Sequence, residues 1–252
     1  MKKYFSMKRR KFITTSIKGG LALSIASQYS FISLQEKYSK NQLIGKDESN
    51  IVGNSYTTKM HKETSEAFKK MKAAAAKENI AIELVSAYRS FDRQKQIFEN
   101  KYQNYTNQGL SPIESIRKII EYSTIPGTSR HHWGTDIDII DANVKRPKNV
   151  LEPQHFHGTG PFCKLKDWLN LHAARFGFYE VYTDDLNRKG FKYEPWHFSF
   201  APVSKPMLQE YKKIDIKQIL QEEKILGSMH FTDDFINQYR NENILDINEY
   251  LL

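Results

Sequence analysis

Apolar residues recur with two different periods along the chain, and the first part of the pattern predicts three helices around one strand. Residues 57–79 carry apolar side chains at helical spacing, and residues 80–85 then alternate apolar with polar or small side chains, as a strand does. A second helix is expected over residues 90–105. Residues 111–122 open with Ser-Pro-Ile-Glu, a capping box with proline at the first helical position, and therefore predict a third helix.

The following stretch predicts a small sheet. Residues 123–135 are rich in proline, glycine and serine and are expected to form a loop, whereas residues 136–140 alternate isoleucine with aspartate, which is typical of a short two-faced strand. A helix is expected over residues 165–176, where a glycine follows and ends it. Residues 178–182 and 192–200 predict two more strands joined by a long turn. This order of elements indicates an α+β fold, in which a small antiparallel sheet with flanking helices carries the functional site.

Both ends of the chain differ in composition from this central part. Residues 27–56 are polar and rich in serine, asparagine and lysine, which predicts a linker. Residues 204–252 are amphipathic in patches and predict a helical C-terminal extension. Residues 57–203 are therefore expected to form the functional domain, in a chain whose 252 residues allow one large domain with appendages.

The net charge of +9 is concentrated at the N-terminus, where it indicates export and not nucleic-acid binding. Removing residues 1–26 with their seven positive charges lowers the net charge to +2. In this stretch a basic block precedes a weakly apolar run, too short to span a membrane, and a Ser-Ile-Ala cleavage site, as in a secretory signal. Arg9 and Arg10 also resemble the twin-arginine signal, so we expect export to the periplasm or another extracytoplasmic space; a general secretion signal is the alternative.

Six of the eight histidines lie between positions 131 and 197, and two short sequences there contain the residue types of a hydrolytic zinc site. Such a site needs three His, Asp or Glu ligands, an open position for water and a carboxylate that is not a ligand. The sequence Ser-Arg-His-His-Trp-Gly-Thr-Asp-Ile-Asp supplies His131 and Asp138 as ligands. The sequence Glu-Pro-Trp-His supplies His197 as the third ligand and Glu194 as the base, and its proline predicts the bend that lets both face the metal.

These sequences resemble the D-alanyl-D-alanine carboxypeptidase and dipeptidase family, the VanY/VanX-like zinc peptidases. Four residues match its signature Ser-x-His-x-x-Gly-x-Ala-x-Asp: Ser129, His131, Gly134 and Asp138. The Glu-Pro-Trp-His sequence is similar to the Glu-x-Trp-His motif of the family. A third similarity is the sequence Ser-Ala-Tyr-Arg-Ser, in which the arginine is Arg89. The three motifs occur in the order that the family has.

The resemblance implies one Zn²⁺ per chain, held by His131, Asp138 and His197. It also implies that Glu194 takes a proton from the zinc-activated water and returns it to the leaving amine. The implied substrates are peptidoglycan stem peptides that end in a D-amino acid, which agrees with the predicted export. Carboxypeptidase, dipeptidase and endopeptidase activity all remain open, as does the oligomeric state.

Further residues are implied to contact the substrate. Arg89 either stabilises the oxyanion or, like Ser129, holds the substrate. Trp196 is implied to line the peptide groove, whereas Trp133 and Tyr88 are expected either in that groove or in the hydrophobic core.

One position departs from the family signature. Asp136 replaces the alanine and lies on the same face of the predicted strand as Asp138, opposite Ile137 and Ile139. We expect Asp136 either to compete for the metal or to hold His131 from behind.

Two other functions remain open at this point. His132 and Asp136, together with His155 or His157, mimic the His-x-x-x-Asp and His-x-His ligands of lysostaphin-like endopeptidases. The other function is a zinc-stabilised cell-wall-binding module without turnover. Glu194 disfavours this module, because a structural zinc site is closed and needs no free base.

Overall fold

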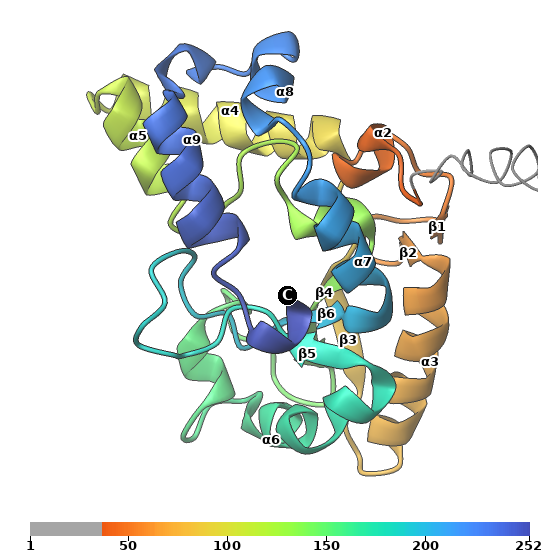
Figure 1. The fold of residues 1–252 in the computed structure, drawn as a ribbon. Coiled ribbons are helices and arrows are strands. Elements are labelled where there is room, and N and C mark those ends of the chain that lie inside the picture. Colours follow the sequence, from red (N-terminus) through yellow and green to blue (C-terminus); the bar gives the residue numbers. More distant parts are fainter. Residues whose placement is uncertain (1–36) are drawn as a thin grey trace, which may run out of the picture. The chain divides into compact units, whose positions relative to one another are not determined.

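The computed structural model describes residues 37–252, and a small antiparallel sheet lies at its centre (Figure 1). The strands are β1 (Ile51–Val52), β2 (Met60–His61), β3 (Ile82–Ser86), β4 (Asp136–Asp141), β5 (Phe178–Glu180) and β6 (His197–Phe200). The central sheet has four strands in the order β3-β4-β6-β5. Strands β1 and β2 pair separately.

Helices surround this sheet and confirm the α+β fold class. The α-helices are α2 (Lys40–Leu43), α3 (Lys62–Ala76), α4 (Phe91–Asn107), α5 (Pro112–Ile119), α6 (Cys163–His172), α7 (Ala201–Tyr211), α8 (Ile216–Glu222) and α9 (Asp233–Tyr239). Short 3₁₀ helices are η1 (Arg130–Trp133), η2 (Pro153–Phe156), η3 (Ala173–Phe176), η4 (Ser228–His230) and η6 (Glu249–Leu251), and η5 (Arg240–Ile244) is a π-helix. Helix α3 runs beside the sheet, whereas α4, α5, α8 and α9 gather at one end of this unit (Figure 1).

The register between β4 and β6 brings polar residues of both strands onto one face of the sheet. Asp138 pairs with His197, and Asp136 pairs with Ser199. Since successive strand residues point to opposite faces, these four side chains share one face. The apolar residues between them point to the other face and belong to the hydrophobic core.

Local sequence signals account for several helix boundaries. The Ser90 side chain caps α4, and Ser111 and Glu114 form the predicted capping box of α5. Gly177 ends η3 in the left-handed conformation, with φ of 82°. A Cβ at this position would come within 2.8 Å of the Phe200 ring, so glycine is required on both grounds.

Two element boundaries differ from those predicted. Helix α3 begins only at Lys62, because the two residues before it form β2 and pair with β1. Strand β6 begins only at His197, because the His197 amide donates to the carbonyl of Glu194 at 3.1 Å and closes a turn. This turn contains Pro195, so the bend predicted between Glu194 and His197 is present.

The segment expected to be a linker is folded in its described part. It contains α2 and β1, and Leu43 and Ile44 are buried in the core. The indole Nε1 of Trp133 donates to the Leu43 carbonyl at 2.9 Å. Residues 38–252 form one compact unit, so this stretch differs from the linker predicted by its polar composition.

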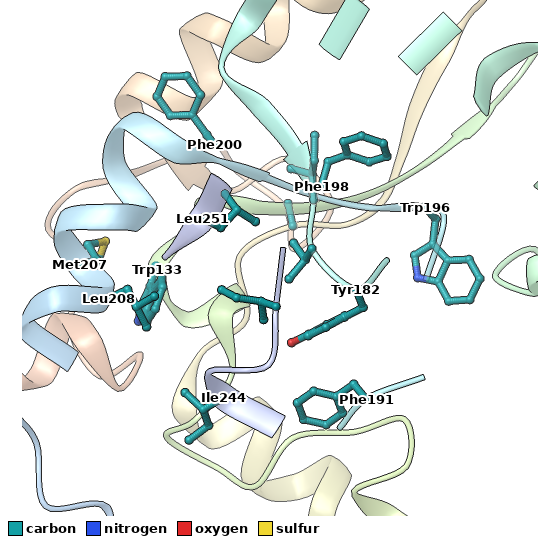
Figure 2. Close-up of a cluster of buried hydrophobic side chains, with 14 of the residues drawn as sticks. Trp133, Tyr182, Phe191, Trp196, Phe198, Phe200, Met207, Leu208, Ile244 and Leu251 are labelled. Carbon is teal, nitrogen blue, oxygen red and sulfur yellow. The ribbon is translucent and has the colours of Figure 1, made fainter. Parts of the chain in front are cut away.

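The C-terminal extension is largely helical and enters the same core. Ile244 and Leu251 lie in one hydrophobic cluster with Trp133, Tyr182 and Phe191 (Figure 2). The predicted export signal lies outside the described residues and stays a prediction. Within the described part, none of the helices combines the length and apolar character that a membrane crossing requires.

Candidate metal centre and substrate cleft

Two histidines and one aspartate meet on the polar face of the central sheet. His131 comes from η1, Asp138 from β4 and His197 from β6. Nε2 of His131 lies 3.5 Å from Oδ2 of Asp138, and Nδ1 of His197 lies 3.9 Å from Oδ1 of the same carboxylate. One ligand atom of each residue lies within 4.8 Å of the others, and all three side chains are buried. The three residues could therefore hold one metal ion.

Hydrogen bonds on the far side of each ring orient the two histidines. Nδ1 of His131 donates to the Ala87 carbonyl at 2.7 Å, which leaves Nε2 as the free nitrogen. Nε2 of His197 lies 2.9 Å from Oδ2 of Asp136, so Nδ1 is the nitrogen turned toward the cluster. Oδ1 of Asp138 is buried and has no hydrogen-bond partner within residues 37–252. Two imidazole nitrogens and a carboxylate with unused lone pairs are donors that suit zinc.

Asp136 lies behind His197 and not behind His131, which corrects the partner expected from the sequence. Its oxygens contact Nε of Arg130 at 2.9 Å and the Ser199 hydroxyl at 2.6 Å, in addition to His197. Although burial alone favours the neutral acid, the Arg130 guanidinium and His197 hold the pKa of Asp136 well below its usual range. Asp136 is therefore a carboxylate engaged with protein groups on both oxygens.

Glu194 lies at the edge of the cluster, where its Oε2 is 2.8 Å from Nδ1 of His197. Burial alone would lower the pKa of His197, but hydrogen bonds to Asp136 and Glu194 raise it to about 10. Burial raises the pKa of Asp138 to about 7; His197 opposes this rise and Glu194 adds to it. The cluster thus binds protons that a metal ion would have to displace.

A cavity of about 570 Å³ opens beside the cluster. Side chains from residues 122–131, 151–154 and 182–197 line it, together with Arg89 and Asp138. Its volume lies within the range of small-ligand sites, and it combines charged groups with aromatic walls. The cluster is therefore positioned to act on a molecule bound in this cavity.

The residues predicted to contact the substrate all line this cavity. The Arg89 guanidinium donates to Oε1 of Gln94 at 3.0 Å and to the Ser86 hydroxyl at 3.1 Å, and burial lowers its pKa. The Ser129 hydroxyl is buried and, among the described residues, lacks a hydrogen-bond partner. Trp196 is buried against the cavity.

Two other aromatic residues considered for the groove lie in the core. The Trp133 indole binds the Leu43 carbonyl, and the Tyr88 hydroxyl donates to the Gly45 carbonyl at 3.1 Å. Neither residue lines the cavity. The aromatic surface of the cleft therefore comes from other parts of the chain.

The structure does not bring together the lysostaphin-like ligand set. Nδ1 of His132 donates to the Arg89 carbonyl at 2.6 Å, and its Nε2 accepts from the Gly127 amide at 3.1 Å. Both ring nitrogens are therefore hydrogen-bonded to backbone groups and not turned toward a metal site. Burial lowers the pKa of His132 to about 4. His155 lies 3.4 Å from Glu152, and His157 contacts Tyr193 at 2.9 Å.

Several residues that line the cavity were not singled out by sequence reasoning, among them Tyr182, Phe191 and Arg130. The Tyr182 ring packs edge-on against His197 with centroids 5.1 Å apart, and Phe191 packs against Tyr182, also at 5.1 Å. Arg130, which binds Asp136, occupies a variable position of the signature. The aspartate at position 136, where the signature has alanine, could have indicated a basic residue such as Arg130, because a buried carboxylate requires a partner.

Comparison with known proteins places this chain in a family and relates its fold to solved structures. Residues 57–203 match the VanY family, described as D-alanyl-D-alanine carboxypeptidase. The chain is 32% identical over 106 residues to an uncharacterized protein of Haemophilus influenzae, which covers 41% of this chain and 81% of that protein. It is 25% identical over 142 residues to a D-alanyl-D-alanine carboxypeptidase of Enterococcus faecalis, which covers 56% of this chain but only 48% of the relative. The structure of the LdcB LD-carboxypeptidase has a similar fold, with a TM-score of 0.50 and 24% identity over 73% of this chain and 77% of that chain.

Proposed function

Because the chain belongs to the VanY family of D-alanyl-D-alanine carboxypeptidases, we propose that it is a zinc-dependent peptidase that removes the C-terminal D-amino acid from peptidoglycan stem peptides. The observation that carries this proposal is the meeting of His131, Asp138 and His197 beside Glu194 at the wall of one cavity. A structural zinc site is closed and needs no free carboxylate nearby. The substrate lies outside the cytoplasm, which is consistent with the export signal predicted at the N-terminus.

The proposed metal ligands are Nε2 of His131, Nδ1 of His197 and a carboxylate oxygen of Asp138. A zinc ion held there would supply Lewis-acid activation of water and of the scissile carbonyl. The Ala87 carbonyl and the Asp136 carboxylate keep the two imidazole rings in the required tautomers. The residues present therefore suit the metal that the family implies.

Glu194 acts as the general base and general acid. Its carboxylate takes a proton from the attacking water and later gives that proton to the amine nitrogen of the leaving D-amino acid. The turn at Pro195 keeps Glu194 beside His197 without making it part of the strand. Tyr182 and Trp196 shield this part of the cavity from bulk water.

Arg89 and Ser129 bind the carboxyl end of the substrate. The guanidinium supplies positive charge for the terminal carboxylate and for the developing oxyanion. Gln94 and Ser86 hold this guanidinium in place, so little side-chain freedom is lost when the substrate binds. The Ser129 hydroxyl, which is unpaired among the described residues, gains a partner in the complex.

The test is digestion of purified muropeptides by the purified protein, with the products weighed by mass spectrometry. We expect pentapeptides ending in D-Ala-D-Ala to lose one alanine, a chelator to stop the reaction and zinc to restore it. A protein with Glu194→Gln is the matched control, since it should bind the same muropeptides without releasing alanine.

Other products would identify a different activity. Release of D-alanine from tetrapeptides alone would indicate an L,D-carboxypeptidase, and cleavage of cross-linked dimers would indicate an endopeptidase. Binding of muropeptides without any cleavage by the wild-type protein would identify a cell-wall-binding module and would overturn the proposal.

A further inference from the structure

The C-terminal segment, residues 205–252, lies outside the part that matches the family, yet it contacts both loops that form the walls of the cavity. We call residues 122–130 the first wall and residues 182–194 the second wall. The first wall leads directly into His131, and the second leads into the turn that carries His197.

Tyr239 of α9 holds the first wall. Its hydroxyl accepts from the Ile125 amide at 3.1 Å and lies 2.8 Å from the Thr128 hydroxyl. Thr128 Oγ1 donates to the Ile125 carbonyl at 2.7 Å, so the Tyr239 hydroxyl is the donor to Thr128. In addition, the Tyr211 hydroxyl donates to the Gly127 carbonyl at 2.7 Å. Two buried tyrosines of this region therefore fix the backbone of residues 125–128.

Asp246 holds the second wall. Its Oδ2 accepts from the amides of Lys189 and Gly190 at 2.6 and 3.1 Å, and the Arg188 guanidinium donates to its carbonyl. Gly190 lies so close to the π-helix η5 that a Cβ would come within 1.6 Å of the Glu242 carbonyl oxygen. The second wall therefore packs directly against the backbone of the C-terminal segment at Gly190.

An aromatic series joins both walls to the metal centre. The Tyr239 ring meets Phe191 at right angles with centroids 6.3 Å apart, Phe191 packs on Tyr182, and Tyr182 packs on His197. Phe191 and Tyr182 line the cavity, whereas Tyr239 is buried behind it (1% exposed). Ile244, also in the C-terminal segment, lies in one hydrophobic cluster with Tyr182 and Phe191 (Figure 2).

We propose that the C-terminal segment is a brace that sets the width of the substrate cleft, with Tyr239 as its central positioning residue. Tyr239 touches neither the metal ligands nor the cavity; it acts through the two walls. This inference rests on the proposed function for its substrate, a peptidoglycan stem peptide. Because the brace contacts the walls at residues 125–128 and 188–190 and not at Glu194, its loss changes substrate binding more than the chemical step.

Tyr239→Phe is the principal test, because it removes the hydroxyl and keeps the ring. The Ile125 amide then loses its hydrogen-bond acceptor, and the Thr128 hydroxyl loses the bond that it accepts from Tyr239 but keeps its own bond to the Ile125 carbonyl. We expect KM for a pentapeptide muropeptide to rise roughly tenfold, kcat to change by less than about threefold, and zinc content to stay the same. Hydrogen exchange of the peptide that covers residues 123–130 should accelerate at least about tenfold, whereas exchange in the central sheet should not change.

Matched variants separate positioning from general loss of stability. Tyr250→Phe removes another tyrosine hydroxyl from the same segment, but Tyr250 is exposed and stacks on Tyr179 outside the walls, so we expect wild-type KM and exchange. Asp246→Ala should raise KM and the exchange of residues 183–191. Asp246→Asn retains an acceptor oxygen for the two amides, so its KM and the hydrogen exchange of residues 183–191 should both lie close to the wild-type values.

Two results would overturn the brace. One is unchanged KM and unchanged exchange of the walls in Tyr239→Phe; the other is faster exchange throughout the protein, which would show a general structural role. If the wild-type protein releases no alanine, the proposed function fails instead. The affinity of uncleaved muropeptide for wild-type and Tyr239→Phe protein then replaces KM, and equal affinities would overturn the brace independently.

Discussion

Nε2 of His197 lies 2.9 Å from Oδ2 of Asp136, and this contact turns Nδ1 of the same ring toward Asp138 and Glu194. The family signature has alanine where this chain has Asp136. The Arg130 guanidinium balances the negative charge of this carboxylate, and its Nε donates to Oδ2 of Asp136 at 2.9 Å. A residue that departs from the signature is therefore part of how this chain orients a proposed metal ligand.

Asp136→Asn should weaken zinc binding by about 10–100-fold, because the amide is a poorer partner for Nε2 of His197 and leaves Arg130 without its counter-charge. Competition with a chromophoric chelator measures the affinity. Asp141→Asn is the control, since Asp141 is also buried but accepts from the amides of Ala81 and Asn143 away from the cluster. Equal zinc affinity of Asp136→Asn and wild-type protein would contradict the role of Asp136.

Glu194→Gln should lower turnover by about 10²–10⁴-fold and leave zinc content unchanged. The amide can still accept a hydrogen bond from water, but it cannot take the proton. Product release is followed by mass spectrometry and metal content by elemental analysis. Loss of zinc in proportion to activity would show that Glu194 is a ligand and not the base.

Alanine at His131, Asp138 or His197 should each give largely metal-free and inactive protein, because one of three protein ligands is lost. His155→Ala and His157→Ala should retain zinc, since both side chains lie outside the cluster. Elemental analysis of the five purified variants decides the assignment. Zinc at the wild-type level in Asp138→Ala protein would exclude Asp138 as a ligand.

Zinc uptake at pH 7 should release more than one proton. His197, with its pKa raised to about 10, is protonated in the metal-free protein at this pH, and Asp138, with a pKa of about 7, is half protonated. Zinc requires the neutral imidazole and the carboxylate, so protons compete with it and zinc affinity falls as the pH falls. The fall should be about tenfold per pH unit between pH 7 and 10 and steeper below pH 7. Calorimetry in buffers of different ionisation enthalpy counts the protons, and a heat independent of buffer would contradict this prediction.

Replacement of both Arg9 and Arg10 by lysine should retain the precursor in the cytoplasm. The double substitution keeps the charge, which the general secretion route tolerates, but it removes the pair that a twin-arginine signal requires. Cell fractionation with an antibody against the protein gives the answer. Normal export of the variant would assign the signal to the general secretion route.

The elements that could be predicted from sequence depend on short-range signals. The capping box at Ser111, the left-handed Gly177 and the alternation of Asp136 and Asp138 with isoleucine each act within a few residues, and the structure contains all three. The meeting of His131, Asp138 and His197 could be anticipated because the motifs imply a site, although the register that brings them together is set by pairing of distant strands.

Other features depend on partners that no local pattern indicates. Polar composition around Leu43 and Ile44 predicted a linker, but two consecutive apolar residues suffice to anchor a short helix on the core. Asp136 could be assigned to His131 or to the metal from its strand face alone, and only the β4–β6 register identifies His197 as its neighbour. The hydrogen bond between Tyr239 and Ile125 likewise could not be predicted, because no sequence pattern in either segment indicates it.

The hydrogen bond between Tyr239 and the Ile125 amide joins residues 114 positions apart, and this separation has a consequence for biosynthesis. At about 5–20 residues per second, a ribosome needs roughly 6–23 s to add the tyrosine after the isoleucine. During this interval the first wall of the cleft exists without its partner hydroxyl, and contacts between residues so far apart in sequence form slowly during folding. A nascent chain therefore contains His131 and His197, the two proposed histidine ligands, before Tyr239 is available to hold the first wall of the cleft.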